Sequence, residues 1–401
     1  MRTEENVRGG YVDEMRLQSA VIDWLRLPLA IAVVFQHSFG APEHVDVDMV
    51  RLHECPLSWQ SMYDFVRIAG SYIITDCAVP TFFMISGFLF FYKVKEWNMS
   101  VYGNKLKKRF WSLFVPYILW ICLFVLHTEM LILGGVLLHG KPLSGMWEYI
   151  IDNGGLNMLW DSFHGEGCYT TDVFGHPAPP TGPVLATLWF VRDLMVVVLF
   201  TPLIHWLIKR FHFIPVIFFG ICYFTRLFIP VHGFSADCFF WFSLGAYFSI
   251  GGKNMVTQLY RFRYPAYVIA LLAIIPLIWY NGKGNEMVHY LYYTYVVCAV
   301  ISLVSIAAWL LRNGKVKLNH WLARTTFFIF LCHMFVLEYV RVYMYNVLVP
   351  EDCYPIMIIA YLIRPFVAVA LCIALYWLLE RYMPRLLSVL TGGRTKMKHY
   401  I

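Results

Sequence analysis

The first long apolar segment, IDWLRLPLAIAVVFQHSFG, carries ionisable side chains, which inside a membrane helix normally face the bundle interior or a watery cavity. Arg26 and His37 are eleven residues apart, which returns both to nearly the same helix face, about 16 Å apart along the axis. Asp23 lies one turn before Arg26 and is placed to orient its guanidinium. An imidazole titrates near neutrality, as general base catalysis requires. The alternative is that Arg26 reaches the headgroups and His37 only hydrogen-bonds a neighbour.

Two further groups of candidates lie in and after the second apolar segment. Ser86, in VPTFFMISGFLFF, belongs to a small-residue patch that lets another helix approach closely, and a nucleophilic role is the less favoured interpretation. The following KLKKRFWSLFVPY places Lys105, Lys108 and Arg109 at the cytoplasmic mouth. There they can bind the phosphates of a donor, or serve only to fix the topology.

Charged and aromatic residues also interrupt the later apolar segments. Trp189 is placed near a membrane interface, whereas Arg192 and Asp193 lie several residues into an apolar run, where they cannot face lipid. They either form an ion pair or line a polar cavity that opens to the outside. His333, in FFIFLCHMFVL, is a secondary candidate for a functional residue. The alternative is a hydrogen-bonded core histidine with a structural role only.

No metal is expected. The His, Glu and Cys residues between the apolar runs show no recognised metal-ligand spacing; they are His44, His53, His164, Glu166, Cys168 and His176. A Walker loop, a GxSxG elbow and an HExxH pair are all missing from the sequence. The sequence therefore contains none of the common metal or nucleotide motifs.

Membrane helices are the elements that must position these side chains. Hydrophobic residues make up 59% of the 401 residues and charged residues only 14%, whereas a soluble protein needs about 25% charged residues. The apolar residues fall in runs of about 20, the length that crosses a bilayer. The net charge of +7 follows from basic residues placed by membrane topology, so no nucleic-acid partner is expected.

The sequence predicts an all-α polytopic membrane protein with about ten transmembrane helices. Connections rich in Lys and Arg alternate with connections poor in them, which places both termini in the cytoplasm. A single membrane domain then covers 1–401, with a cytoplasmic segment at 1–19, an extracytoplasmic loop at 139–183 and a cytoplasmic tail at 384–401. The apolar runs lie at 20–39, 70–92, 110–138, 184–208, 212–230, 235–250, 264–281, 288–311, 323–349 and 355–380.

Four segments together resemble acyltransferase family 3, a family of membrane enzymes, and they occur in that family's order. They are DWLRLPLAIAVVFQH, VPTFFMISGFLFF, KKRFWSLFVPY and LWFVRDLMVVVLFTPLI, with weaker similarity in FFWFSLGAY and FFIFLCHMFVL. The similarity spans nearly the whole chain. Family members often have Arg-x-x-Arg before the third helix, whereas here Arg109 is followed by Ser112. Lys105 or Lys108 is therefore expected to supply the second charge.

The resemblance implies a membrane O-acyltransferase of the bacterial inner membrane. Such an enzyme moves an acyl group, commonly acetyl, from cytoplasmic acyl-CoA to a hydroxyl of an extracytoplasmic glycan or glycolipid. It implies that His37 is the general base or carries the acyl group. Arg26 and the basic cluster would hold the donor's charges or the developing oxyanion. Trp189, Arg192 and Asp193 would shape the acceptor side.

Two other functions remain open from the residues alone. A transporter of a sugar, a carboxylate or a lipid-linked intermediate also buries Arg, Asp and His in a helix bundle, but transporters often show inverted repeats, and none is evident here. A noncatalytic partner of a glycan-assembly complex would leave His37 and Arg26 dispensable. The sequence does not indicate the identity of the acceptor, the acyl chain or the oligomeric state.

Overall fold

The computed structural model is helical almost throughout. The one sheet in the described residues is a short antiparallel ladder between β1 (Thr170–Thr171) and β2 (Pro177–Ala178). The predicted all-α class is therefore confirmed. The structure describes residues 2–39, 54–140, 142, 144–152, 155–161, 170–171, 177–178, 182–227, 229, 231–280, 286–350 and 353–394.

The chain folds into two compact units. Unit 1 comprises Met1–Phe90, Phe248–Leu378 and Met397–Ile401, and unit 2 comprises Phe91–Tyr247 and Leu379–Lys396. The helices of unit 1 are α1 (Arg2–Gln36), α3 (Trp59–Ile68), η1 (Ala69–Ile74), α4 (Ala78–Phe91), α12 (Met255–Tyr260), α13 (Arg263–Trp279), α14 (Glu286–Arg312), α15 (His320–Tyr343), η5 (Met344–Leu348) and α16 (Tyr354–Tyr382). Those of unit 2 are α5 (Met99–Arg109), η2 (Phe110–Phe114), α6 (Val115–His139), α7 (Ser144–Asp152), η3 (Gly155–Leu159), η4 (Ala186–Leu188), α8 (Trp189–Leu199), α9 (Thr201–Phe211), α10 (Ile214–Thr225), α11 (Ala236–Ile250) and α17 (Pro384–Leu390).

Six helical segments of the described chain are long and apolar enough to cross a membrane, and the bent pair α8 and α9 makes a possible seventh. The other predicted runs coincide with α10, α11 and α13, which have 12, 15 and 17 residues. At 1.5 Å per residue these helices are about 18–26 Å long, shorter than a hydrocarbon core of about 30 Å. The protein is an integral membrane protein. The count of ten crossings and the cytoplasmic termini stay predictions.

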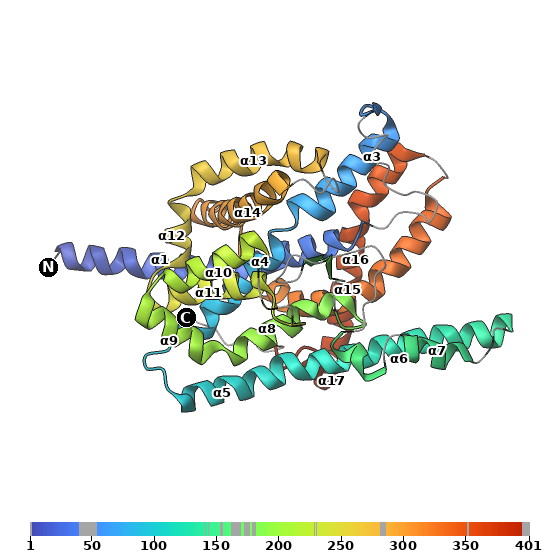
Figure 1. The fold of residues 1–401 in the computed structure, drawn as a ribbon, viewed down its shortest axis with the longest axis horizontal. Coiled ribbons are helices and arrows are strands. Elements are labelled where there is room, and N and C mark those ends of the chain that lie inside the picture. Colours follow the sequence, from blue (N-terminus) through green and yellow to red (C-terminus); the bar gives the residue numbers. More distant parts are fainter. Residues whose placement is uncertain are drawn as a thin grey trace. The chain divides into compact units, whose positions relative to one another are not determined.

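Helix α1 is the central element of unit 1. It packs against α14 and α15, while α13 runs beside α14 (Figure 1). Its buried stripe has a residue every four positions, with Val21, Leu25, Leu29 and Val33 each no more than 2% exposed. This spacing keeps one apolar face toward the neighbouring helices.

The second span begins earlier than the predicted run at 70–92. The helix starts at Trp59, where the side chain of Ser58 accepts from the Ser61 backbone N–H, and Ala69–Ile74 forms the π-helical turn η1. Asp64 and Arg67 therefore lie on the span, not in a connection. Their charges lowered the hydropathy of this stretch, but both side chains are buried against protein.

The third span is also longer than the predicted run at 110–138. The helical segment is continuous from Met99 to His139 through the π-helical turn η2. Lys105, Lys108 and Arg109 therefore lie on a helix that continues into the span. This arrangement gives the basic cluster a fixed backbone.

The C-terminal segment packs against this same helix in unit 2. Trp120 Nε1 donates to the Leu390 carbonyl at 3.0 Å, and Arg394 Nη1 donates to the Ser112 carbonyl at 2.6 Å. Gly392 has a φ of +61°, and a Cβ at this position would lie 2.6 Å from Ser112 Cα. Only glycine fits such a close approach in this conformation. The described part of the predicted tail therefore packs against α6 and η2.

We expect Gly70→Ala to destabilise unit 1, because a Cβ at residue 70 would lie 2.3 Å from the Tyr361 hydroxyl oxygen. Overpacking of this kind costs about 1–3 kcal/mol. Adding Tyr361→Phe removes the oxygen and should recover part of the loss. Gly103→Ala is the control, because nothing lies within 4 Å of its added Cβ. Thermal unfolding in detergent measures the effect, and an unchanged midpoint for Gly70→Ala would contradict it.

Candidate active site

Unit 1 brings two histidines from different elements together. His37 lies in the turn after α1 and His333 lies on α15, with their ring centroids 5.3 Å apart. His333 Nδ1 is 3.1 Å from the Ile329 carbonyl and 2.8 Å from the Phe330 carbonyl. A carbonyl only accepts, so Nδ1 carries the hydrogen and Nε2 of the neutral ring keeps a lone pair. Nε2 is buried and has no hydrogen-bond partner among the described residues.

A carboxylate joins three elements next to this pair. Gln36, which precedes His37 in the chain, donates from Nε2 to Asp76 Oδ1 at 2.9 Å. The Tyr292 hydroxyl of α14 donates to Asp76 Oδ2. Asp76 lies between η1 and α4 and is half-buried. Sequence reasoning missed this residue, although an acid in the middle of SYIITDCAVP was a visible signal.

The end of α1 that carries His37 is held by side chains of the second span. Ser71 Oγ donates to the Phe35 carbonyl at 2.7 Å, and Arg67 Nη1 donates to the Phe39 carbonyl at 3.1 Å. Phe35 lies in the last turn of α1, where carbonyls lack the usual intrahelical partner, and Phe39 lies just beyond the end of the helix. The two donors therefore bond the backbone on both sides of His37. The position of His37 therefore depends on the second span as well as on its own helix.

Arg67 is itself fixed by a buried ion pair. Its Nη2 donates to Asp64 Oδ1 at 2.7 Å, and its guanidinium carbon lies 4.4 Å from the ring centroid of Tyr63. Arg67 is 1% exposed and Asp64 is fully buried. Sequence reasoning missed this pair because it started the span at residue 70. The signal was the Asp-x-x-Arg spacing, which brings two side chains together on one helix face.

Arg364 is a second buried arginine that sequence reasoning missed. It lies on α16, is 1% exposed, and its guanidinium carbon is 5.5 Å from the ring centroid of Tyr345. The Tyr345 hydroxyl is 3.1 Å from that of Tyr63. A charge in the middle of the apolar run 355–380 was sufficient to mark this residue as a candidate.

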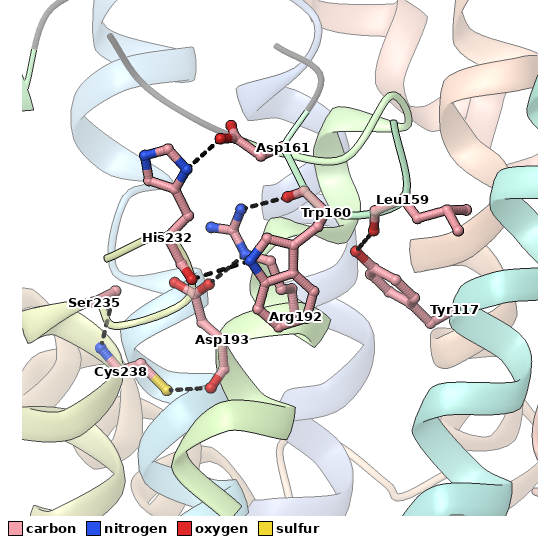
Figure 2. Close-up of polar contacts among 9 residues, drawn as sticks. All are labelled: Tyr117, Leu159, Trp160, Asp161, Arg192, Asp193, His232, Ser235 and Cys238. Carbon is pink, nitrogen blue, oxygen red and sulfur yellow. Dashed lines mark hydrogen bonds and ion pairs between the residues drawn. The ribbon is translucent and has the colours of Figure 1, made fainter. Parts of the chain in front are cut away.

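Unit 2 contains the predicted pair Arg192 and Asp193 (Figure 2). Arg192 Nε donates to Asp193 Oδ1 at 3.0 Å and Arg192 Nη1 donates to the Trp160 carbonyl at 2.9 Å. The two side chains are only 4% and 2% exposed. The structure shows the ion pair, and the lining of a polar cavity that opens to the outside stays a prediction.

The long loop between α6 and α8 is anchored around this pair. Trp160 Nε1 donates to the His232 carbonyl at 3.1 Å, and the His232 ring contacts the Asp161 carboxylate (Figure 2). The Tyr117 hydroxyl of α6 donates to the Leu159 carbonyl. Because α7, η3 and these contacts are ordered, the described parts of the predicted loop at 139–183 are folded against unit 2.

The remaining predicted residues are placed separately. Asp23 and Arg26 form the expected pair, with Asp23 Oδ1 3.1 Å from Arg26 Nη2. Ser86 is half-buried on α4 in unit 1. Trp189 is half-buried at the first residue of α8 in unit 2. The described contacts do not join Ser86 to the histidine pair.

The basic cluster of unit 2 includes Arg394, which sequence reasoning did not identify. Lys105 and Arg109 are half-buried on α5, whereas Lys108 is exposed. Arg394 reaches the Ser112 carbonyl, three residues after Arg109. An arginine from the C-terminal segment therefore lies where the family resemblance leads us to expect one at position 112.

Metal sites can be assessed only in part of the chain. Among the described residues no group of three His, Cys, Asp or Glu side chains is placed to hold a metal ion. His44, His53, His164, Glu166, Cys168 and His176 lie outside the described residues.

Comparison with known proteins identifies the family. A model of the acyltransferase domain family, Acyl_transf_3, matches residues 20–381. The chain belongs to this family. It is 25% identical over 398 residues to the succinoglycan biosynthesis protein ExoH of Rhizobium meliloti (strain 1021), a match that covers 95% of this chain and 94% of that protein. No solved structure matches the chain.

Family membership confirms the resemblance inferred from the four segments. The chain is a membrane-embedded O-acyltransferase, and the matched region includes helices of both units. The roles of individual residues in the acyltransferase reaction stay predictions.

We expect Arg192→Leu to destabilise unit 2, because it leaves the buried Asp193 carboxylate without its ion-pair partner. Breaking a buried pair costs about 3–5 kcal/mol. The double variant Arg192→Leu with Asp193→Leu should lose less stability than the single variant. Arg341→Leu is the control, because its pair with Glu338 is more exposed and exposed pairs contribute at most about 1 kcal/mol. Equal losses in thermal unfolding for Arg192→Leu and Arg341→Leu would contradict this prediction.

Proposed function

We propose that this enzyme transfers an acyl group, specifically acetyl, from cytoplasmic acyl-CoA to a hydroxyl of an extracytoplasmic glycan or glycolipid at a bacterial inner membrane. The observation that supports this most directly is the contact between the half-buried His37 and the fully buried His333. Acyltransferases need a base that can accept a proton near neutral pH, and imidazole is the side chain that does so.

In the proposed reaction His37 takes the proton of an acceptor hydroxyl. The hydroxyl oxygen forms a bond to the carbonyl carbon of the thioester, and the bond between that carbon and sulfur breaks. His37 then gives its proton to the departing thiolate, so the products are an ester and free CoA thiol. In the alternative sequence, a ring nitrogen of His37 bonds the thioester carbon as its bond to sulfur breaks and the thiolate leaves. The acceptor hydroxyl then bonds that carbon as its bond to the ring nitrogen breaks, and the hydroxyl proton ends on the CoA thiolate. Both sequences require the same imidazole.

His333 is the residue proposed to orient His37. Its Nδ1 hydrogen is directed to the carbonyls of its own helix, which leaves Nε2 able to accept a hydrogen bond from the neighbouring ring. Such an acceptor holds an imidazole in one orientation and one tautomer, and it stabilises the imidazolium that forms when His37 takes a proton. His333 would then act through His37 and would not touch the reacting atoms.

The cationic residues of unit 2 are proposed to bind the phosphates of the donor. Arg109, Lys105 and Lys108 lie on one helix, and Arg394 is held near them by its hydrogen bond to Ser112. Guanidinium and ammonium groups form charge-assisted hydrogen bonds with phosphate oxygens. Arg26, paired with Asp23, is proposed to stabilise the negative charge that develops on the thioester oxygen.

The similarity to a succinoglycan biosynthesis protein supports a polysaccharide or its lipid-linked precursor as the acceptor. Trp189, Arg192 and Asp193 are proposed to stabilise the part of unit 2 that meets the acceptor. Their buried contacts favour a structural contribution to that surface.

His37→Ala should abolish transfer of radiolabelled acetyl from acetyl-CoA into extracytoplasmic glycan, because it removes the base. His333→Asn should lower the transfer rate by about 100-fold or more, within the range for loss of a general base contribution. Asparagine keeps a donor for the Ile329 and Phe330 carbonyls but places nothing at Nε2. This substitution therefore separates the structural hydrogen bond from the proposed role in catalysis.

Thermal unfolding of both variants should match that of the wild type. His139→Ala, at an exposed position at the end of α6, is the matched control and should retain full transfer. Full activity of His333→Asn would show that His333 is only a core histidine, and full activity of His37→Ala would remove His37 from the mechanism. Absence of label with the wild type would argue for another donor or for a transporter.

Arg109→Ala and Arg394→Ala should each raise the KM for acetyl-CoA about tenfold or more, with a smaller effect on kcat. Loss of one hydrogen bond to a charged group has this magnitude. Lys315→Ala is the control, because Lys315 is an exposed basic residue of unit 1. An unchanged KM in both arginine variants would place the donor's phosphates elsewhere.

A further inference from the structure

The contacts of Asp76 suggest more than a structural role for this carboxylate. It is held by Gln36 of α1 and by Tyr292 of α14, so three separate elements of unit 1 meet at one half-buried side chain. A carboxylate has about four lone-pair positions and accepts several hydrogen bonds at once. It can therefore accept from a ligand while these two donors keep it in place.

Asp76 is linked to the end of α1 that carries the proposed base. Gln36 is the residue before His37, and its side chain bonds both Asp76 and the Thr75 carbonyl at 3.3 Å. A ligand hydroxyl bound by Asp76 would therefore lie close to the end of α1 that carries His37. This is where an acceptor hydroxyl has to be for proton abstraction.

Tyr292, which bonds the Asp76 carboxylate, belongs to a chain of aromatic side chains in contact with one another on α14. The His289 ring contacts those of Tyr290 and Tyr293, with centroids 5.4 Å and 4.7 Å apart, and the Tyr292 and Tyr293 centroids are 5.3 Å apart. Rings beside a fixed polar group combine an apolar contact face with orienting hydrogen bonds, the usual composition of a small-molecule site.

We infer that Asp76, Tyr292 and the adjoining rings of α14 form a subsite that binds the sugar of the acceptor. Its carboxylate accepts hydrogen bonds from neighbouring sugar hydroxyls, and the tyrosine rings contact the apolar face of the pyranose. This inference rests on the proposed function, because it names the part of unit 1 that presents a glycan hydroxyl to His37. It also separates this sugar contact from the cations of unit 2 that are proposed to bind the donor.

The test measures acceptor binding and acyl transfer separately. Oligosaccharides from de-acylated cell-envelope polysaccharide of the host strain are the probe, and binding to detergent-purified protein is measured by saturation-transfer NMR. Asp76→Asn and Tyr292→Phe should each weaken binding about tenfold or more, as expected for loss of a hydrogen bond to a charged group. Both variants should raise the KM for the acceptor and leave the KM for acetyl-CoA unchanged.

Asp152→Asn, at an exposed position at the end of α7, is the matched control and should bind like the wild type. Thermal unfolding identifies any variant that has lost its fold. If Asp76→Asn is unstable, the Tyr292→Phe result decides the test. Failure of the wild type to bind the probe, or equal binding by the wild type and both variants, would overturn the subsite. Binding that depends on Asp76 without acetyl transfer by the wild type would instead overturn the proposed function.

Discussion

A buried charge inside a membrane protein needs a partner within the protein, and this constraint shapes the surroundings of Arg67 and Arg192. Lipid tails offer no hydrogen bonds, so an unpartnered charge is strongly unfavourable there. Arg67 is paired with Asp64, and Arg192 is paired with Asp193. The carboxylate lies within one helical turn of Arg67 and is next in the chain to Arg192, and it neutralises the guanidinium in each case. Nη1 of each arginine bonds a backbone carbonyl. Each ion pair therefore also fixes a neighbouring segment of the chain.

The end of α1 that carries the proposed base is held by the second span. Carbonyls in the last turn of a helix lack the usual intrahelical partner and can bond outside donors. Ser71 of the second span donates to the Phe35 carbonyl in this turn, and Arg67 donates to the Phe39 carbonyl just beyond it. The π-helical turn η1, with Ser71 within it and Arg67 just before it, is a local irregularity of the kind that often occurs at functional sites. The orientation of His37 thus depends on contacts between the end of α1 and the irregular part of the second span.

The proposed chemistry divides between the two compact units. The histidine pair and Asp76 belong to unit 1, whereas Arg109 and Arg394 belong to unit 2. The family match includes helices of both units, so both belong to the enzyme. Because the proposed base and the proposed donor site can be changed independently, each can be tested without disturbing the core of the other unit.

The sequence alone determined that this chain is helical and membrane-embedded, because long apolar runs leave few other options in a bilayer. It also determined the Asp23–Arg26 pair, which depends on local helical spacing. Tertiary structure decided the contact between His37 and His333 and the place of Arg394 at Ser112, since residues about 300 positions apart have no periodicity that reveals their contact. It also decided where the second span starts. A charged residue lowers the hydropathy of a segment, and only the partner that neutralises it shows that the segment is buried.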